Sequence, residues 1–140
     1  MSIEETEKEI VEEFELFDDW MGKYENIIDT GKSVPLIDPK YKDENHLIKG
    51  CQSQVWLHSE YKEGKIFYSA DSDAIITKGL VALIIRVLSC HTPEEILNAK
   101  MDFIDKIGLK EHLSPTRSNG LTAMIKQIKL DAQAHAIAKR

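Results

Sequence analysis

The sequence predicts an α+β fold in which a small antiparallel β-sheet packs against several helices. Residues 54–61 and 65–71 are typical of strands, and the turn residues between them predict a β-hairpin. Patterns typical of helices come before and after this hairpin. The 140 residues suit a single domain over residues 1–140, with enough volume for an apolar core.

Two helices are predicted before the hairpin. Ser2 and Glu5 form a capping-box pattern, and apolar residues then recur at helical spacing. Asp18 or Asp19 can start a second helix, which is expected to end near Gly31.

The segment between the second helix and the hairpin is expected to be irregular. Residues 31–45 contain prolines, a glycine and several charges, which predicts a loop. Residues 46–50 follow the loop and could add a third short strand.

The helix after the hairpin is expected to form the centre of the core. Residues 73–90 are apolar nearly all round, so the helix should be covered on most sides. Asp71, Ser72 and Asp73 precede it, and the plainest role for them is to cap it.

Three further helices complete the prediction. Thr92, Pro93 and Glu95 provide a cap, a first-turn proline and a glutamate at the third position. A short apolar helix is expected over residues 102–107. The last helix runs from about Pro115 towards the C-terminus.

Composition favours a cytoplasmic protein that binds neither nucleic acid nor membrane. The net charge is −6, and no apolar run reaches membrane-spanning length. Residues 1–19 carry nine acidic side chains and one lysine, and this start lacks the basic and apolar parts of a signal peptide. Residues 117–140 carry five basic side chains and one aspartate, an asymmetry typical of solvated helix faces.

The chain has two cysteines, Cys51 and Cys90, and a disulfide between them is improbable in a reducing compartment. Neither has a CxxC neighbour, and the five histidines show no recognised metal spacing, so no metal site is expected. Cys90 ends the apolar helix and is expected to be a buried structural thiol.

Cys51 has an unusual setting for a structural cysteine. It follows Gly50, which widens the backbone choices, and it precedes Gln52, Ser53 and Gln54, which suit a loop. A reactive thiol needs exposure and a positive or dipolar environment. Residue types alone leave two readings open, an inert thiol at a strand start and a working one.

Arg117 is the second unusual residue. If Ser114 caps the last helix and Pro115 begins it, Arg117 places a cation in the first turn, where it opposes the helix dipole. The alternative is that the helix begins at Ser118 and Arg117 lies in the loop. Gly120 would let another segment approach the helix end.

Three motifs carry a family resemblance, in the order "GCQSQVW" at 50–56, "DSDAIITKGL" at 71–80 and "SPTRSNGL" at 114–121. The stretch at 19–35, which includes Tyr24, also fits. The chain resembles the SufE family over nearly its whole length, least at 91–108 and in the last dozen residues.

The resemblance implies the SufE/NifU-like fold and a sulfur acceptor in iron–sulfur cluster assembly. The cysteine matching Cys51 would take sulfur as a persulfide from a SufS-type cysteine desulfurase and pass it to a SufB-containing scaffold complex. Pyridoxal phosphate would belong to the desulfurase, so this chain needs no cofactor. It would stimulate the desulfurase without turnover of its own, as a monomer or weak homodimer.

The resemblance also assigns site residues. Arg117 would favour the thiolate or persulfide, or contact the partner. Asp73 would anchor the cysteine loop or lie at the interface, together with Gly50, Gln52 and Ser53. In the family the free cysteine is tucked against apolar surface, and docking would expose it. The NifU-like scaffolds use three cysteines, which this chain lacks in the corresponding region.

Three alternatives stay open. A CsdE-type acceptor shares much of the pattern and would serve a different desulfurase. A cysteine hydrolase or peroxide-reducing enzyme would need a base or second cysteine beside Cys51, and His58, His91 and His112 are candidates. In an interaction module, Cys51 would be incidental.

Overall fold

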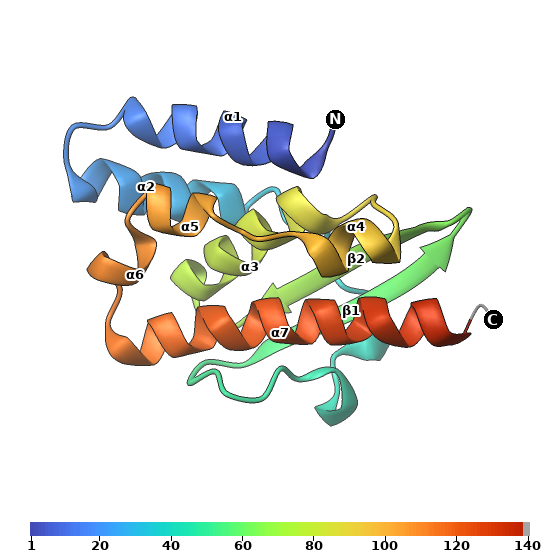
Figure 1. Cartoon of the computed structure of the whole chain (residues 1–140). Helices are drawn as coiled ribbons and strands as arrows, with labels where there is room; N and C mark the ends of the chain where they lie inside the picture. Colours follow the sequence, from blue (N-terminus) through green and yellow to red (C-terminus); the bar gives the residue numbers. More distant parts are fainter. Residues whose placement is uncertain (139–140) are drawn as a thin grey trace.

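The computed structural model describes residues 1–138 and confirms the α+β class (Figure 1). The elements follow in the order α1 (Ile3–Glu15), α2 (Trp20–Gly31), the 3-10 helices η1 (Pro39–Tyr41) and η2 (Glu44–His46), β1 (Val55–Lys62), β2 (Lys65–Ser72), α3 (Ile75–Leu88), α4 (Pro93–Asn98), α5 (Phe103–Lys106), α6 (Leu109–His112) and α7 (Pro115–Ala138). None of the helices within residues 1–138 is both long enough and apolar enough to cross a bilayer.

The predicted hairpin is confirmed, because β1 and β2 pair antiparallel over their full length. Glu63 and Gly64 make the turn, both with positive φ (51° and 82°), which is the two-residue turn that suits the strand twist. The third strand expected at 46–50 is wrong. That segment contributes a single bridge between Leu47 and Trp56.

The segment expected to be a loop, residues 31–45, contains η1 and the start of η2 and runs along the edge of β2. The Ile37 amide donates to the Ala70 carbonyl at 3.2 Å, and the Ala70 amide donates to the Pro35 carbonyl at 2.9 Å. These bonds occupy part of the strand edge and bring the chain towards the cysteine segment.

Helix α3 is central, as predicted, with eleven buried residues out of fourteen. It crosses α2 very closely at two glycines. A Cβ on Gly79 would lie 2.1 Å from the Ile27 carbonyl oxygen, and one on Gly31 would lie 2.9 Å from the Gly79 nitrogen. Helix α2 ends at Gly31 as expected, but the close crossing is what requires glycine there, since the cap, Lys32, is right-handed.

Helix α1 begins with the predicted capping box, and Asp19 caps α2 by accepting from the Gly22 amide at 2.9 Å. The Arg86 guanidinium of α3 donates to Glu9 and Glu13 of α1. Together with the buried apolar face of α1, these ion pairs hold the N-terminal helix on the core.

The second half of the chain forms helices α4 to α7, which agree with the sequence prediction except for one additional short helix. The capping box of α4 is confirmed. The expected helix at 102–107 corresponds to α5, and Gly108, with φ of 76°, turns the chain into the additional short helix α6. Helix α7 begins at Pro115, as expected.

The expectation that Cys90 is a buried thiol is wrong, because its side chain is exposed. Cys90 has φ of 68°, and its amide donates to the Ile66 carbonyl at 2.7 Å. The Ile66 amide donates in turn to the His91 carbonyl at 2.9 Å. This left-handed turn pairs the chain with β2 immediately after α3 and points the side chain outward.

Candidate functional site: the pocket beside Cys51

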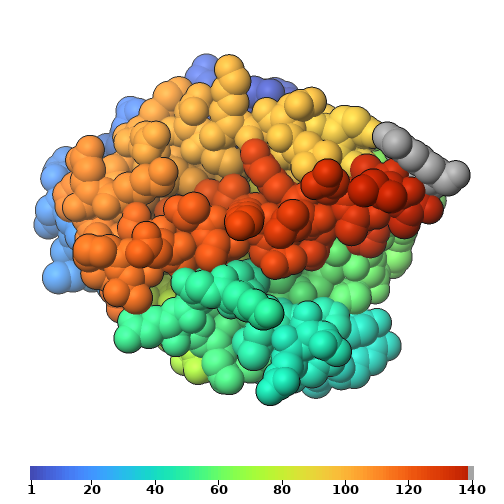
Figure 2. All heavy atoms as spheres, turned by 60° about the horizontal axis from the view of Figure 1, so that its bottom comes forward, coloured from blue at the N-terminus to red at the C-terminus, as the bar shows by residue number. Residues whose placement is uncertain are grey.

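Cys51 lies where the chain passes over α7 before entering β1. Gly50 has φ of 95°, a conformation that favours glycine, and a Cβ there would lie 3.1 Å from the Cβ of Ala123. Figure 2 shows the segment around residues 40–50 lying alongside α7. The backbone therefore needs Gly50 both for its turn and for its approach to the helix.

Gly120 provides the other half of this contact. The Cys51 thiol donates a weak hydrogen bond to the Gly120 carbonyl, with an Sγ–O distance of 3.5 Å. A Cβ on Gly120 would lie 3.5 Å from the same sulfur. Another segment does approach the helix at Gly120, as expected, and it is the one that carries Cys51, but 3.5 Å is an ordinary contact distance that would leave room for a Cβ.

A pocket of about 100 Å³ opens beside the sulfur. Its lining is Cys51, Gln52, Ser53, Thr77, Leu80, Thr116, Arg117, Gly120 and Met124. Among the described residues that line it, Arg117 alone carries a charge. The structure thus brings together the loop residues that were singled out in the sequence and Arg117 from the start of α7.

Arg117 lies inside the first turn of α7. The Ser114 hydroxyl accepts from the Arg117 amide at 3.3 Å, which decides between the two helix starts considered above. The guanidinium donates from Nη1 to the hydroxyl of Tyr24 at 2.6 Å and lies 5.9 Å from the centre of that ring. The sequence marked Tyr24 only as a family position, because a contact across 93 residues leaves no local signal.

Burial raises the pKa of the Cys51 thiol above its ordinary value, since the charged form loses solvation. The side chain is half-buried against the core. The thiol in this conformation is therefore protonated near neutral pH, which keeps it unreactive as a nucleophile.

Asp73 anchors the backbone just after the cysteine. Its Oδ1 accepts from the Gln54 amide at 3.0 Å, and the Ser72 hydroxyl donates to the Gln54 carbonyl at 2.8 Å. The expectation that Asp73 caps α3 is wrong, because Ala74 occupies the cap position and the Asp73 carboxylate bonds to Gln54 instead.

The candidate histidine partners lie elsewhere. Within residues 1–138, no histidine lines the pocket beside Cys51. The imidazole of His58 stacks on Tyr41, with ring centres 3.7 Å apart, and that of His112 stacks on Trp20 at 4.3 Å. A cysteine–histidine pair of the kind a hydrolase uses is therefore not assembled in this conformation.

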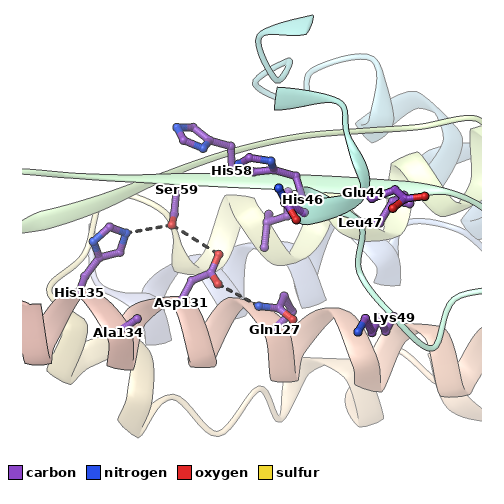
Figure 3. A pocket seen from close by; sticks show the side chains of 12 residues that line it. Glu44, His46, Leu47, Lys49, His58, Ser59, Gln127, Asp131, Ala134 and His135 are labelled. Atoms are coloured by element: carbon purple, nitrogen blue, oxygen red, sulfur yellow. Dashed lines mark hydrogen bonds between the residues drawn. The ribbon is translucent and has the colours of Figure 1, made fainter. Parts of the chain in front are cut away.

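A larger hollow of about 600 Å³ lies between η2, β1 and the second half of α7 (Figure 3). The Ser59 hydroxyl oxygen is 2.9 Å from Nε2 of His135 and donates to Oδ2 of Asp131 at 3.4 Å, and Oδ1 of Asp131 accepts from Nε2 of Gln127 at 2.9 Å. In a catalytic triad the acid contacts the histidine, and the histidine contacts the nucleophile. Here Asp131 contacts the serine and not the histidine, so the three side chains are not arranged as a triad. These contacts join β1 to α7.

A metal site was not expected from the sequence. Across the described residues, no group of three or more histidine, cysteine, aspartate or glutamate side chains is arranged to hold a metal ion.

Comparison with known proteins identifies the family. The profile of SufE, described as an Fe-S metabolism associated domain, matches residues 8–132, which is most of the chain. The chain belongs to the SufE family. Membership connects it with iron–sulfur metabolism, in which SufE proteins act as sulfur acceptors and work with a cysteine desulfurase.

Individual SufE-like proteins support the assignment. The chain is 36% identical over 130 residues to an uncharacterized SufE-like protein of Synechocystis, covering 93% of this chain and 82% of that protein. It is 35% identical over 130 residues to an uncharacterized SufE-like protein of Rhizobium meliloti, covering 89% of this chain and 93% of that protein. It is 39% identical over 120 residues to SufE-like protein 1, chloroplastic/mitochondrial, of Arabidopsis thaliana. That match covers 85% of this chain but only 32% of the longer plant protein.

A solved structure supports the α+β fold of the chain independently. The solution structure of a hypothetical protein from Thermus thermophilus superposes with a TM-score of 0.76 at 21% identity, covering 92% of this chain and 94% of that one. At this identity, the likeness concerns the fold alone.

Proposed function

We propose that this protein accepts sulfur on Cys51, as a persulfide, from a pyridoxal-phosphate-dependent cysteine desulfurase of the SufS type. The single observation that carries the proposal is the placement of Cys51, on a segment tied to Gly120 and beside a pocket that opens to Arg117. A SufE family member with its loop cysteine in this position has the group that sulfur transfer requires.

The transfer step is a thiol exchange. The Cys51 thiol loses its proton, and the thiolate attacks the terminal sulfur of the desulfurase persulfide. A new sulfur–sulfur bond forms on Cys51, the old one breaks, and the desulfurase cysteine leaves as a thiolate. Because burial raises the pKa of Cys51, docking must expose the sulfur or bring a cation to it before the step is fast.

The neighbouring residues have supporting roles in this proposal. Arg117 stabilises the thiolate or persulfide anion, or contacts the desulfurase. Gly50, Gln52 and Ser53 lie against the partner, and Gly50 also allows the segment to change conformation. Asp73 keeps the end of the segment in place through Gln54.

The rest of the pathway follows from the same proposal. The persulfide passes to a scaffold complex that contains SufB, and the protein works in the cytoplasm as a monomer or weak homodimer. It uses no cofactor of its own and stimulates the desulfurase as an accessory protein. A CsdE-type acceptor differs only in the desulfurase that serves it.

The intact mass of the protein after incubation with SufS-type desulfurase and free cysteine, without reductant, tests the proposal. We expect a gain of one sulfur atom in the wild type and in Cys90→Ser, reversed by excess thiol. Cys51→Ser should gain none. Because the chain has only these two cysteines, the two variants are matched controls for each other.

A gain that persists in Cys51→Ser would contradict the assignment of the carrier. No gain and no change in desulfurase rate would contradict the SufS-type partner, and repeating the assay with a CsdE-type system's desulfurase tests the alternative. Turnover of a substrate without any desulfurase would instead support the hydrolase reading.

A further inference from the structure

Tyr24 holds the charged group that lines the Cys51 pocket. Its hydroxyl accepts from Nη1 of Arg117 at 2.6 Å, and the guanidinium carbon lies 5.9 Å from the centre of its ring. The ring is partly buried and packs against the core, whereas Arg117 is exposed. The fixed partner in this pair is therefore the tyrosine.

The surroundings of Tyr24 reinforce this arrangement. One turn earlier on α2, Trp20 stacks on His112 of α6, with ring centres 4.3 Å apart and planes 17° from parallel. Helix α6 leads directly into the start of α7. The stack thus ties the chain before Arg117 to the same helix that carries Tyr24.

Within residues 1–138, the Cys51 sulfur has no cationic partner in this conformation, and its thiol donates to the Gly120 carbonyl instead. Arg117 and Cys51 line one pocket, yet burial is the cause that raises the pKa of the thiol. An arginine placed against the sulfur would lower that pKa. The Arg117 guanidinium donates to the Tyr24 hydroxyl instead.

We propose that Tyr24 is a positioning residue that holds the Arg117 guanidinium away from the Cys51 sulfur. When the guanidinium leaves the Tyr24 hydroxyl, it can pair with the Cys51 sulfur anion. An arginine side chain can change rotamers without moving the helix that carries it. Resting and active thiol states would then differ in which acceptor Arg117 contacts. The benefit of this change of Arg117 partner rests on the proposed function, since a sulfur acceptor benefits from a thiol that stays inert until its partner docks.

The reactivity of Cys51 with a neutral dipyridyl disulfide, measured against pH, tests this proposal. All proteins carry Cys90→Ser, so that Cys51 is the one thiol followed. Tyr24→Phe removes the acceptor and keeps the ring. We expect a lower midpoint in the pH profile and a reaction about threefold faster at neutral pH, because a tenfold gain in thiolate is partly offset by weaker nucleophilicity.

The Arg117→Ala background provides the matched control. There Tyr24→Phe should change neither the midpoint nor the rate, because the arginine that it releases is absent. Tyr24→Leu, which removes the ring as well, should act in the same direction as Tyr24→Phe when Arg117 is present. Circular dichroism and denaturant unfolding in the same buffer show whether each variant is folded.

An unchanged or higher midpoint in folded Tyr24→Phe would overturn the proposal, as would an equal effect in the Arg117→Ala background. The assay contains no desulfurase. It can therefore fail while the sulfur-uptake assay succeeds, or succeed while that assay fails, so the two proposals are tested separately.

Discussion

At the scale of single residues, the central feature is a thiol that the fold keeps protonated. Cys51 donates a hydrogen bond to the Gly120 carbonyl, and partial burial raises its pKa. Free reactive cysteines usually lie in electropositive surroundings that lower the pKa of the thiol. In the proposed role, a thiol that stays protonated until its partner docks does not react with other disulfides in the meantime.

The rate of Cys51 alkylation by iodoacetamide should rise with pH to a midpoint above the ordinary thiol value in the folded protein. In denaturant the midpoint should fall to the ordinary value, because unfolding restores solvation of the thiolate. The Cys90→Ser variant isolates the signal. Equal midpoints in the folded and unfolded states would show that burial does not control this thiol.

At the scale of elements, the cysteine segment is held at both ends. Gly50 contacts α7 on one side, and Asp73 and Ser72, at the junction of β2 and α3, bind the Gln54 backbone on the other. The three residues between these anchors, Cys51, Gln52 and Ser53, line the pocket. A partner can therefore move a short segment without unfolding the strands.

Asp73→Ala should loosen the segment and speed hydrogen exchange at the Gln54 amide, because the hydrogen bond from that amide is lost. Asp73→Asn keeps an oxygen that can accept this bond and should exchange nearly as slowly as the wild type. If asparagine and alanine behave alike, the charge of Asp73 matters and the hydrogen bond does not.

The crossing of α2 and α3 depends on glycine. Gly79→Ala should lower the free energy of unfolding by about 1–3 kcal/mol or more, because the added Cβ would overlap the Ile27 carbonyl of the neighbouring helix backbone. Chemical denaturation measures the change.

Gly120→Ala is the matched control for that substitution. It also places alanine in a buried helical site, but the nearest atom, Sγ of Cys51, is at an ordinary contact distance of 3.5 Å. We expect unchanged stability or a gain of up to about 1 kcal/mol from helix propensity. Equal losses in the two variants would contradict the role of the close crossing.

At the scale of the whole molecule, helix α1 covers one side of the core and carries several acidic side chains. It packs on α3 and α5, and Glu7 accepts from the Phe103 amide at 3.3 Å. Burial raises the pKa of Glu7, and Asp102 and Glu4 add to the shift. The ionised form of this carboxylate therefore weakens the docking of α1 at neutral pH.

Because the pKa of Glu7 is higher in the folded than in the unfolded state, its carboxylate costs stability above the folded pKa, and this cost disappears as pH falls below the unfolded value. Glu7→Gln should therefore unfold at higher denaturant than the wild type at neutral pH. The difference should vanish in acid, below the ordinary glutamate pKa. A difference that is constant across this range would assign the effect to packing.

Much of the fold was predictable because its signals are local. The capping boxes at Ser2 and Thr92, the β-hairpin and the all-round apolar character of α3 each depend on a few neighbouring residues. The third strand was wrong because residues 46–50 pair with β1 at a single bridge, Leu47–Trp56, and the pairing goes no further. The buried Cys90 was wrong because backbone pairing with Ile66, 24 residues away, turns its side chain outward.

The sequence by itself determined the fold class, the family and the loop residues on either side of Cys51, since short motifs and periodic patterns encode them. Only the tertiary structure decided what those residues do to one another. Gly120 meets the sulfur across 69 residues, and Tyr24 holds Arg117 across 93. No local pattern encodes such pairs, because the packing of α2 and α7 around α3 sets their distance.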